Sequence, residues 1–306
     1  MSTARIPGHF LLVMVCACAP LLMGGACEKK TSKPADTGAI NALDRTDPAT
    51  ASDTTPLTGI DVSKLDAAKQ KQFYQLVGSL NSPCGKTHSL RTSFASDTSC
   101  KRAPFAVRYV AALVEDEATE DQIRQEYAHK YEAAKTVKLD VSKAPRVGND
   151  DAPVRIVEFF DYACPHCAQL KPMLDQIAKE NAGKLVEYFL MYPLGKWPDS
   201  KSAAQAALAA HRQGKFKEMH ALLFAKSPIH NKDAVMGYAK ELGLDLAKFE
   251  TDYAAAAAHV ETDKAQGETA GVESTPTLFF NDRKYEGPMS PKYIGMWIDE
   301  EVAVNR

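Results

Sequence analysis

Two cysteines separated by two residues, Cys164 and Cys167, are the feature of this 306-residue sequence that most clearly indicates chemistry. They follow an apolar run at 153–160, typical of a β-strand, and open a segment with helical periodicity. A cysteine at the start of a helix lies over unpaired N–H groups and the positive end of the helix dipole, and both favour its thiolate. The spacing therefore predicts a redox-active dithiol, with Cys164 as the nucleophile and Cys167 as its partner.

The two residues between the cysteines, Pro165 and His166, complete the tetrapeptide Cys-Pro-His-Cys. A histidine beside a thiolate can stabilise it by charge or by a hydrogen bond. Because this stabilises the reduced form, it makes the disulfide a stronger oxidant. The alternative is that His166 is a solvated residue at the start of a helix. Its place between two cysteines favours the functional interpretation.

A structural disulfide, a zinc site and a haem site are the alternatives for this dithiol. Closing so short a loop gains little entropy, which disfavours a stabilising disulfide. A structural zinc site needs two further Cys or His ligands, but His211, His220 and His230 form no second paired motif. The apolar neighbours of His220 at helical spacing instead predict a core position. Covalent haem would need a histidine directly after Cys167, where Ala168 stands. We therefore predict no metal and no cofactor.

The first 26 residues are typical of an export signal. Residues 10–23 form an apolar stretch too short to span a bilayer, and small residues follow it before Cys27. This arrangement resembles a bacterial lipoprotein signal, which implies cleavage before Cys27 and a lipid on that cysteine. Cys18 is the rival site, but its use would leave Cys27 as an odd thiol in an oxidising compartment. An ordinary signal peptide without lipid is the other alternative.

Residues 27–58 are polar, with almost no large apolar side chains, and predict a flexible tether. Thirty flexible residues have a root-mean-square span of roughly 30 Å, enough to hold a domain clear of a membrane. The whole chain carries 37 basic and 39 acidic residues, a net charge of −2. This balance gives no reason to expect nucleic acid as a partner.

Residues 59–138 have the period of three short amphipathic helices and predict a small all-α domain. Thr119 and Gln122 have the spacing of a capping box that opens the third helix. So small a bundle gains from a covalent staple. Cys84 and Cys100, which flank the loop region between the first two long helices, are the candidates for a structural disulfide.

Residues 146–306 alternate strands and helices. Strands are predicted at 153–160, 185–191, 277–280 and 284–286, with a turn at Asn281-Asp282. Helices are predicted from Cys164 to about residue 182, with Gly183 as the C-cap, through an Ala-rich region at 200–271, and from Ser290 onward. The order β-α-β, helical insertion, β-β-α predicts the α/β class: a thioredoxin fold with an inserted helical subdomain, preceded by the small all-α domain.

The segment 157–167, which ends in Cys-Pro-His-Cys, resembles the active site of the DsbA family of periplasmic disulfide oxidants. In that family a glutamate six residues before the first cysteine lies buried beneath the dithiol and assists proton movement. Glu158 stands at that offset, which implies the same role. A strand glutamate facing solvent is the alternative, but the apolar neighbours of Glu158 favour burial.

Thr275 and Pro276 form the second element of the resemblance, since they lead into the apolar strand at 277–280. Thioredoxin-like proteins carry a cis-proline at this place, facing the first cysteine. The preceding residue offers backbone hydrogen bonds to a bound peptide, and this implies a substrate-binding role for Thr275 and Pro276. The similarity covers residues 146–306, about half of the chain.

The all-α domain resembles the small three-helix domain of CcmH-type cytochrome c maturation proteins, in Ser89-Leu90, Arg108, the capping segment from Thr119 and Tyr131. That family carries Cys-x-x-Cys at the first turn, whereas this chain has only Cys84 there. The departure favours a structural disulfide over a second redox centre.

The resemblance implies an enzyme that donates a disulfide from Cys164–Cys167 to reduced exported proteins, beginning with attack on an exposed Cys164 sulfur. A membrane partner would reoxidise the dithiol. The location implied is the bacterial periplasm, with a membrane anchor at lipidated Cys27. Two alternatives stay open: a reductase or isomerase, acting on thiols such as those of apocytochromes, and a non-catalytic peptide-binding module.

Overall fold

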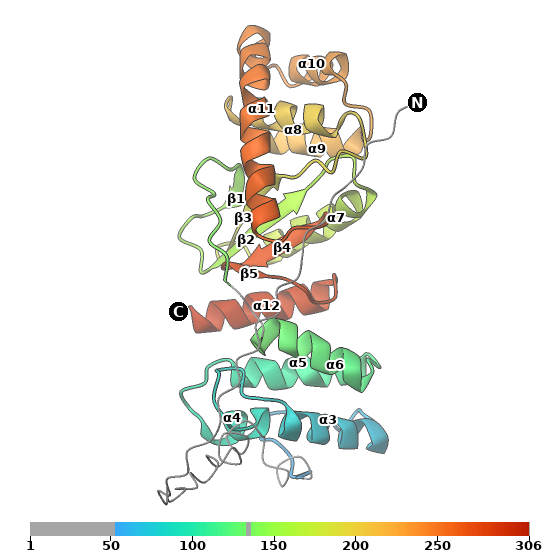
Figure 1. Cartoon of the computed structure of the whole chain (residues 1–306), viewed down its shortest axis with the longest axis vertical. Helices are drawn as coiled ribbons and strands as arrows, with labels where there is room; N and C mark the ends of the chain where they lie inside the picture. The colour runs from blue at the N-terminus through green and yellow to red at the C-terminus, as the bar shows by residue number, and fades with distance from the viewer. Residues whose placement is uncertain (1–52, 133–135, 306) are drawn as a thin grey trace, which may run out of the picture. The chain divides into compact units, whose positions relative to one another are not determined.

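The computed structural model describes residues 53–132 and 136–305 (Figure 1). The predicted export signal, the lipidation site Cys27 and most of the predicted tether lie outside the described residues. Within the described ranges no helix is long and apolar enough to cross a membrane.

The end of the predicted tether is packed rather than free. Arg91 donates from Nε to the Asp53 carboxylate at 2.8 Å, and Leu57 is buried in the core of the helical bundle. Asp53 and Leu57, which lie within the predicted tether, thus contact the bundle. Composition alone predicts flexibility here because it does not show these contacts with distant residues.

The first part of the described chain is a helical bundle. It comprises α3 (Ala67–Ser79), α4 (Leu90–Ser96), α5 (Ala103–Glu115), α6 (Glu120–Tyr127) and the π-helical turn η1 (Ala128–Glu132). Thr119 and Gln122 form both hydrogen bonds of the predicted capping box. Cys84 and Cys100 are joined in a disulfide with their Cα atoms 5.7 Å apart. The disulfide encloses the short helix α4, in a region where the sequence predicts a loop.

A five-stranded sheet follows, with the order β1-β3-β2-β4-β5. Its strands are β1 (Arg146–Gly148), β2 (Val154–Phe160), β3 (Leu185–Met191), β4 (Thr277–Phe280) and β5 (Arg283–Lys284). Only β2 and β3 pair in parallel. Asn281 and Asp282 form the predicted two-residue turn, with φ angles of 45° and 70° that suit a hairpin.

Helices cover both faces of this sheet (Figure 1). α7 (Pro165–Glu180) and α12 (Pro291–Val304) pack on one face, and the end of α11 (Leu246–Thr269) packs on the other. α7 ends with Asn181 as its C-cap, so Gly183 lies in the following turn and is not the predicted cap. The Ala-rich insertion consists of α8 (Ser200–His211), α9 (Phe216–Ala225), α10 (Lys232–Glu241) and α11.

Helix α12 belongs to two hydrophobic cores. Ile294, Trp297 and Ile298 pack against α7 and the sheet, whereas Tyr293 packs into the helical bundle. The bundle and the sheet therefore share one helix.

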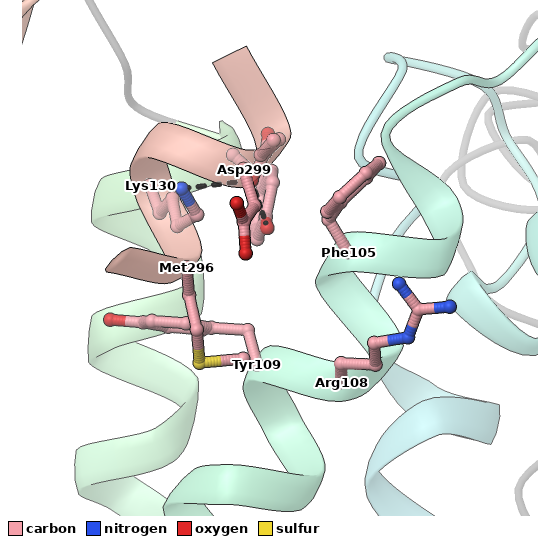
Figure 2. A pocket seen from close by; sticks show the side chains of 8 residues that line it. Phe105, Arg108, Tyr109, Lys130, Met296 and Asp299 are labelled. Carbon is pink, nitrogen blue, oxygen red and sulfur yellow. Dashed lines mark hydrogen bonds and ion pairs between the residues drawn. The ribbon is translucent and has the colours of Figure 1, made fainter. Parts of the chain in front are cut away.

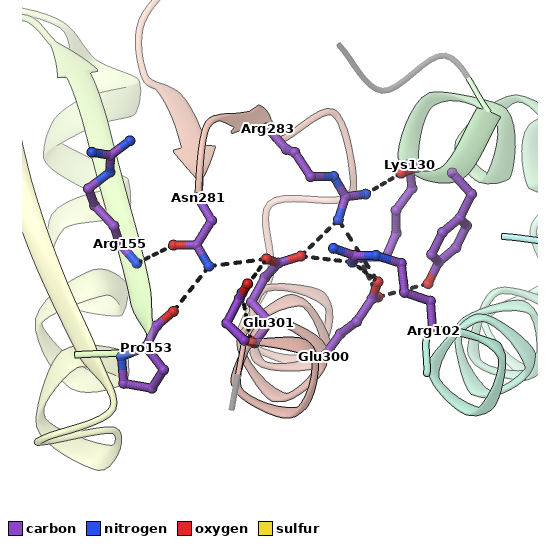
Figure 3. Close-up of polar contacts among 10 residues, drawn as sticks. Arg102, Lys130, Pro153, Arg155, Asn281, Arg283, Glu300 and Glu301 are labelled. Carbon is purple, nitrogen blue, oxygen red and sulfur yellow. Dashed lines mark hydrogen bonds and ion pairs between the residues drawn. The ribbon is translucent and has the colours of Figure 1, made fainter. Parts of the chain in front are cut away.

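An ionic network strengthens this junction (Figure 3). Glu301 of α12 accepts hydrogen bonds from Arg102 at 2.9 Å and from Arg283 at 2.8 Å. Glu300 accepts from Tyr131 at 2.9 Å and lies 2.9 Å from the Lys130 ammonium. Both carboxylates are thus buried with partners drawn from the bundle and from the sheet.

A small cavity of about 60 Å³ adjoins the network (Figure 2). Phe105, Tyr109 and Met296 contribute apolar walls, and the buried Lys130 ammonium lines it 3.5 Å from the centre of the Trp297 ring. Burial, offset only in part by the Glu300 carboxylate, lowers the pKa of Lys130 to about 7. The cavity contains none of the residues predicted for the redox site.

Candidate redox site

The dithiol lies where β2 passes into α7. Cys164 has extended backbone angles directly before the helix, and Pro165 occupies the first helical turn, where a missing N–H costs nothing. The buried Asp161 carboxylate holds the turn before it by accepting from the backbone N–H groups of Ala163 and Leu194, both at 2.9 Å. The strand, the turn and the helix start therefore position the first cysteine as the sequence analysis expected.

Both cysteines are free thiols, and both are buried. Cys164 is 3% exposed and donates from Sγ to the Thr275 carbonyl oxygen at 3.4 Å. The expectation of an exposed Cys164 sulfur is therefore wrong for this state of the molecule. The segment at Thr275 covers the sulfur and is more than 100 residues away in sequence, so local pattern could not reveal it.

The Thr275–Pro276 peptide bond is cis, as the resemblance implied, and it leads directly into β4. Beside it lies a groove of about 440 Å³. The groove is bounded by His166, Leu170 and Met173 of α7, the segment 274–276, and Met289, which is 43% exposed. The structure thus places His166 and Pro276 at one groove, next to the residue that contacts Cys164.

Glu158 lies in the middle of β2 and is 4% exposed. Burial raises its pKa well above the ordinary value, and the neighbouring Glu187 raises it further. Glu158 in turn contributes, after burial, to a raised pKa of the Cys167 thiol. The predicted buried acid is therefore electrostatically coupled to the second cysteine.

Glu187 is a site residue that the sequence analysis missed. It lies on β3, is 4% exposed, and its Oε1 atom has no hydrogen-bond partner. Burial and the nearby Asp175 raise its pKa to about 7, while Lys171 acts in the opposite direction. The sequence contains a signal for this residue, because Glu187 interrupts an apolar strand just as Glu158 does.

His220 confirms its predicted place in the core. It is 6% exposed, and its Nδ1 atom lies 3.0 Å from the hydroxyl of Tyr162. Burial lowers the pKa of His220 to about 3, so the ring is neutral at ordinary pH. In the described part of the chain no cluster of His, Cys, Asp and Glu side chains could hold a metal ion.

A mixed sheet, a dithiol at a strand-to-helix turn and a facing cis-proline define a protein of the thioredoxin class. A family model described as thioredoxin matches residues 140–300, more than half of the chain. The chain therefore belongs to the thioredoxin family.

Solved structures and curated proteins give further matches. BdbD from Bacillus subtilis, in its oxidised form, is 24% identical with a TM-score of 0.50, over 55% of this chain and 98% of that chain. A thioredoxin-like oxidoreductase from Silicibacter pomeroyi DSS-3 is 31% identical with a TM-score of 0.47, over 51% and 91%. The match to BdbD, together with the family model, confirms the predicted thioredoxin fold.

The curated relatives carry the name Na(+)/H(+) antiporter. NhaA 1 of Mycobacterium sp. (strain KMS) is 35% identical over 146 residues, which are 46% of this chain and 24% of that protein. NhaA of Herminiimonas arsenicoxydans is 32% identical over 142 residues, or 22% of that protein. The chain thus spans about a quarter of the length of these relatives.

Proposed function

We propose that this protein is an extracytoplasmic thiol–disulfide oxidoreductase that donates a disulfide from Cys164–Cys167 to reduced exported proteins. The observation that carries the proposal is the contact between the Cys164 thiol and the Thr275 carbonyl beside cis-Pro276. This contact sets the nucleophile next to a backbone that can pair with an extended peptide. Neither a structural disulfide nor a metal site requires such an arrangement.

The reaction begins with the oxidised protein. A substrate thiolate attacks Sγ of Cys164, a new S–S bond forms, and the electron pair of the old bond leaves on Sγ of Cys167. A second substrate thiolate then attacks the substrate sulfur of this mixed disulfide and releases Cys164 as a thiolate. The substrate loses two electrons and becomes a disulfide, and the protein gains them as a dithiol.

The groove beside Pro276 supplies the binding surface. Leu170, Met173 and Met289 make it apolar, and methionine side chains adapt to varied partners. A peptide that pairs with the Thr275 backbone would bring its cysteine against Cys164. Such a surface suits unfolded polypeptides of differing sequence.

The direction of transfer and the location are part of the same proposal. His166 borders the groove and would stabilise the Cys164 thiolate, which favours a disulfide donor. A membrane partner would then reoxidise the dithiol. The protein would act in the periplasm, anchored by lipid on Cys27. Replacing Cys27 with serine should release it from membranes, and fractionation would show this.

Oxidation of a reduced, unfolded substrate tests the activity. The oxidised wild-type protein should restore the enzymatic activity of reduced ribonuclease A, and Cys164→Ser should not. The doubly substituted Cys84→Ser/Cys100→Ser protein is the control, because it keeps the redox dithiol. Equal rates for wild type and Cys164→Ser would refute the proposal.

A further inference from the structure

The pair of buried glutamates behind the dithiol has a feature that the proposed reaction does not yet use. Glu158 pairs with Phe189 across the parallel strands β2 and β3, and Ile156 pairs with Glu187. Glu158 and Glu187 are therefore on the same face of the sheet, one strand and two residues apart. This spacing puts their Cα atoms roughly 8 Å from each other, within reach of two long side chains.

The pair lacks counter-ions of its own. Within the described ranges neither glutamate side chain forms a hydrogen bond or an ion pair, and Oε1 of Glu187 is a buried atom without a partner. Lys171, the nearby cation, is bound to Asp175 with its Nζ at 2.5 Å from the carboxylate. The remaining titratable groups that interact with the pair are Cys167 of α7 and Tyr162 of the turn, both through Glu158.

Two carboxylates in such a place cannot both be ionised at low cost. A buried charge without a partner is strongly disfavoured, and a second like charge nearby adds to the penalty. One proton held by the pair removes the like-charge repulsion and leaves one buried charge instead of two. The raised pKa values of Glu158 and Glu187 agree with this geometry, and coupled groups of this kind titrate as a pair.

We propose that Glu158 and Glu187 hold one proton between them, so that Glu187 controls the proton that Glu158, in the role implied by the DsbA resemblance, gives to the Cys167 sulfur when the disulfide opens. This inference rests on the proposed function and adds Glu187 as a positioning residue that acts through Glu158. The sequence of events balances: the electron pair of the S–S bond goes to Cys167, and the proton goes from Glu158 to that sulfur.

The pair Glu158 and Glu187 regains its proton from solvent. Asp175 has a side chain that is 62% exposed, whereas that of Lys171 is 19% exposed, and both interact with Glu187. Both also interact with Glu158, so Lys171 and Asp175 mark the side from which solvent can reach the pair, and Glu158 is the member that interacts with Cys167. In the reverse reaction the Cys167 proton returns to the pair before the thiolate attacks.

Reduction of the oxidised protein by dithiothreitol, followed from pH 5 to pH 9, tests the inference. In Glu187→Gln, Glu158 has no like-charged neighbour and ionises at a lower pH. The ratio of the variant rate to the wild-type rate should be near one at low pH. At higher pH it should fall by about tenfold, as a shift of one unit in the pKa of Glu158 requires. Glu300→Gln, an equally buried glutamate in the ionic network, should keep a pH-independent ratio. A pH-independent ratio for Glu187→Gln would overturn the inference.

A second measurement needs no folding-sensitive variant. In the reduced wild-type protein with ¹³C-labelled glutamate, two Cδ resonances should each titrate in two steps, as coupled groups do. Independent single-step titrations would overturn the shared proton. Failure of the proposed function would give a different result. Dithiothreitol reduction would then not involve Cys164, while the titration of the two glutamates would be unaffected.

Discussion

Two pairs of buried glutamates in this protein have opposite surroundings. Glu300 and Glu301 of α12 are 0% and 1% exposed, and each carboxylate binds cations from other elements. Glu158 and Glu187 of the central strands are each 4% exposed and, among the described residues, have no bonded cation. Buried glutamates in this protein therefore either have their negative charge compensated by bonded cations or have almost no such compensation.

The difference appears in the pKa values of Glu301 and Glu158. Burial by itself would raise the pKa of Glu301, but Arg102 and Arg283 hold it below its ordinary value. Burial raises the pKa of Glu158, and its glutamate neighbour adds to the effect. A compensated carboxylate remains charged and joins elements, whereas an uncompensated one exchanges a proton. The first pair is thus suited to structure and the second to chemistry.

The largest effect is expected at the dithiol itself. Cys167→Ser should accumulate mixed disulfides between Cys164 and substrates, because no Cys167 thiolate is present to attack the mixed disulfide and expel the substrate, while Cys164→Ser should accumulate none. Non-reducing electrophoresis of proteins from cells that produce each variant would show the adducts. Adducts in the Cys164→Ser variant instead would reverse the assignment of the nucleophile.

The compensated pair should be the more sensitive to truncation. Glu300→Ala leaves the buried Lys130 without its carboxylate, and breaking a buried ion pair in this way costs about 3–5 kcal/mol. Urea unfolding should show this loss, with the pH dependence of disulfide reduction unchanged. A loss below about 1 kcal/mol would mean that the network contributes little to the junction.

The bundle disulfide should stabilise without taking part in exchange. Replacing both Cys84 and Cys100 with serine opens a loop with a sequence separation of 16 and should lower the free energy of unfolding by up to about 3 kcal/mol. Oxidation of a reduced substrate should continue at the wild-type rate. A variant that folds normally yet loses this activity would make the bundle a second redox centre.

The uncompensated pair predicts a smaller, pH-dependent effect. The pKa of Glu187 rises from 4.5 to about 7 on folding, so the folded state binds more protons in this window and stability falls as the pH rises through it. Glu187→Gln should flatten the pH dependence of unfolding between pH 4.5 and 7, a change of about 1–3 kcal/mol. Parallel curves for variant and wild type would show that Glu187 is not protonated on folding.

Sequence pattern was sufficient where local rules govern the structure. The strands at 185–191 and 277–280 were predicted to the residue, since their apolar runs end at clear turns. β1 was missed because its three residues have no buried face. The fold and the dithiol can be predicted in the same way, from a motif at a strand-to-helix turn.

The parts of the site that depend on distant segments could not be predicted from the sequence. The burial of Cys164 comes from Thr275, and the pairing of Glu158 with Glu187 comes from strand register. Glu187 carried a usable signal, an acid within an apolar strand, but only the register shows which acid it faces. The ionic network at Glu300 likewise joins residues about 200 positions apart in sequence.

The reduction potential of Cys164–Cys167 tests the central claim, that this site donates disulfides, most directly. Equilibration of the purified protein with glutathione buffers should give a potential above about −200 mV, in the range of oxidising members of the class. His166→Leu should lower it by tens of millivolts, about 30 mV for each 1.4 kcal/mol of lost thiolate stabilisation. A wild-type potential near about −270 mV, unchanged in His166→Leu, would contradict the claim and make the protein a reductant.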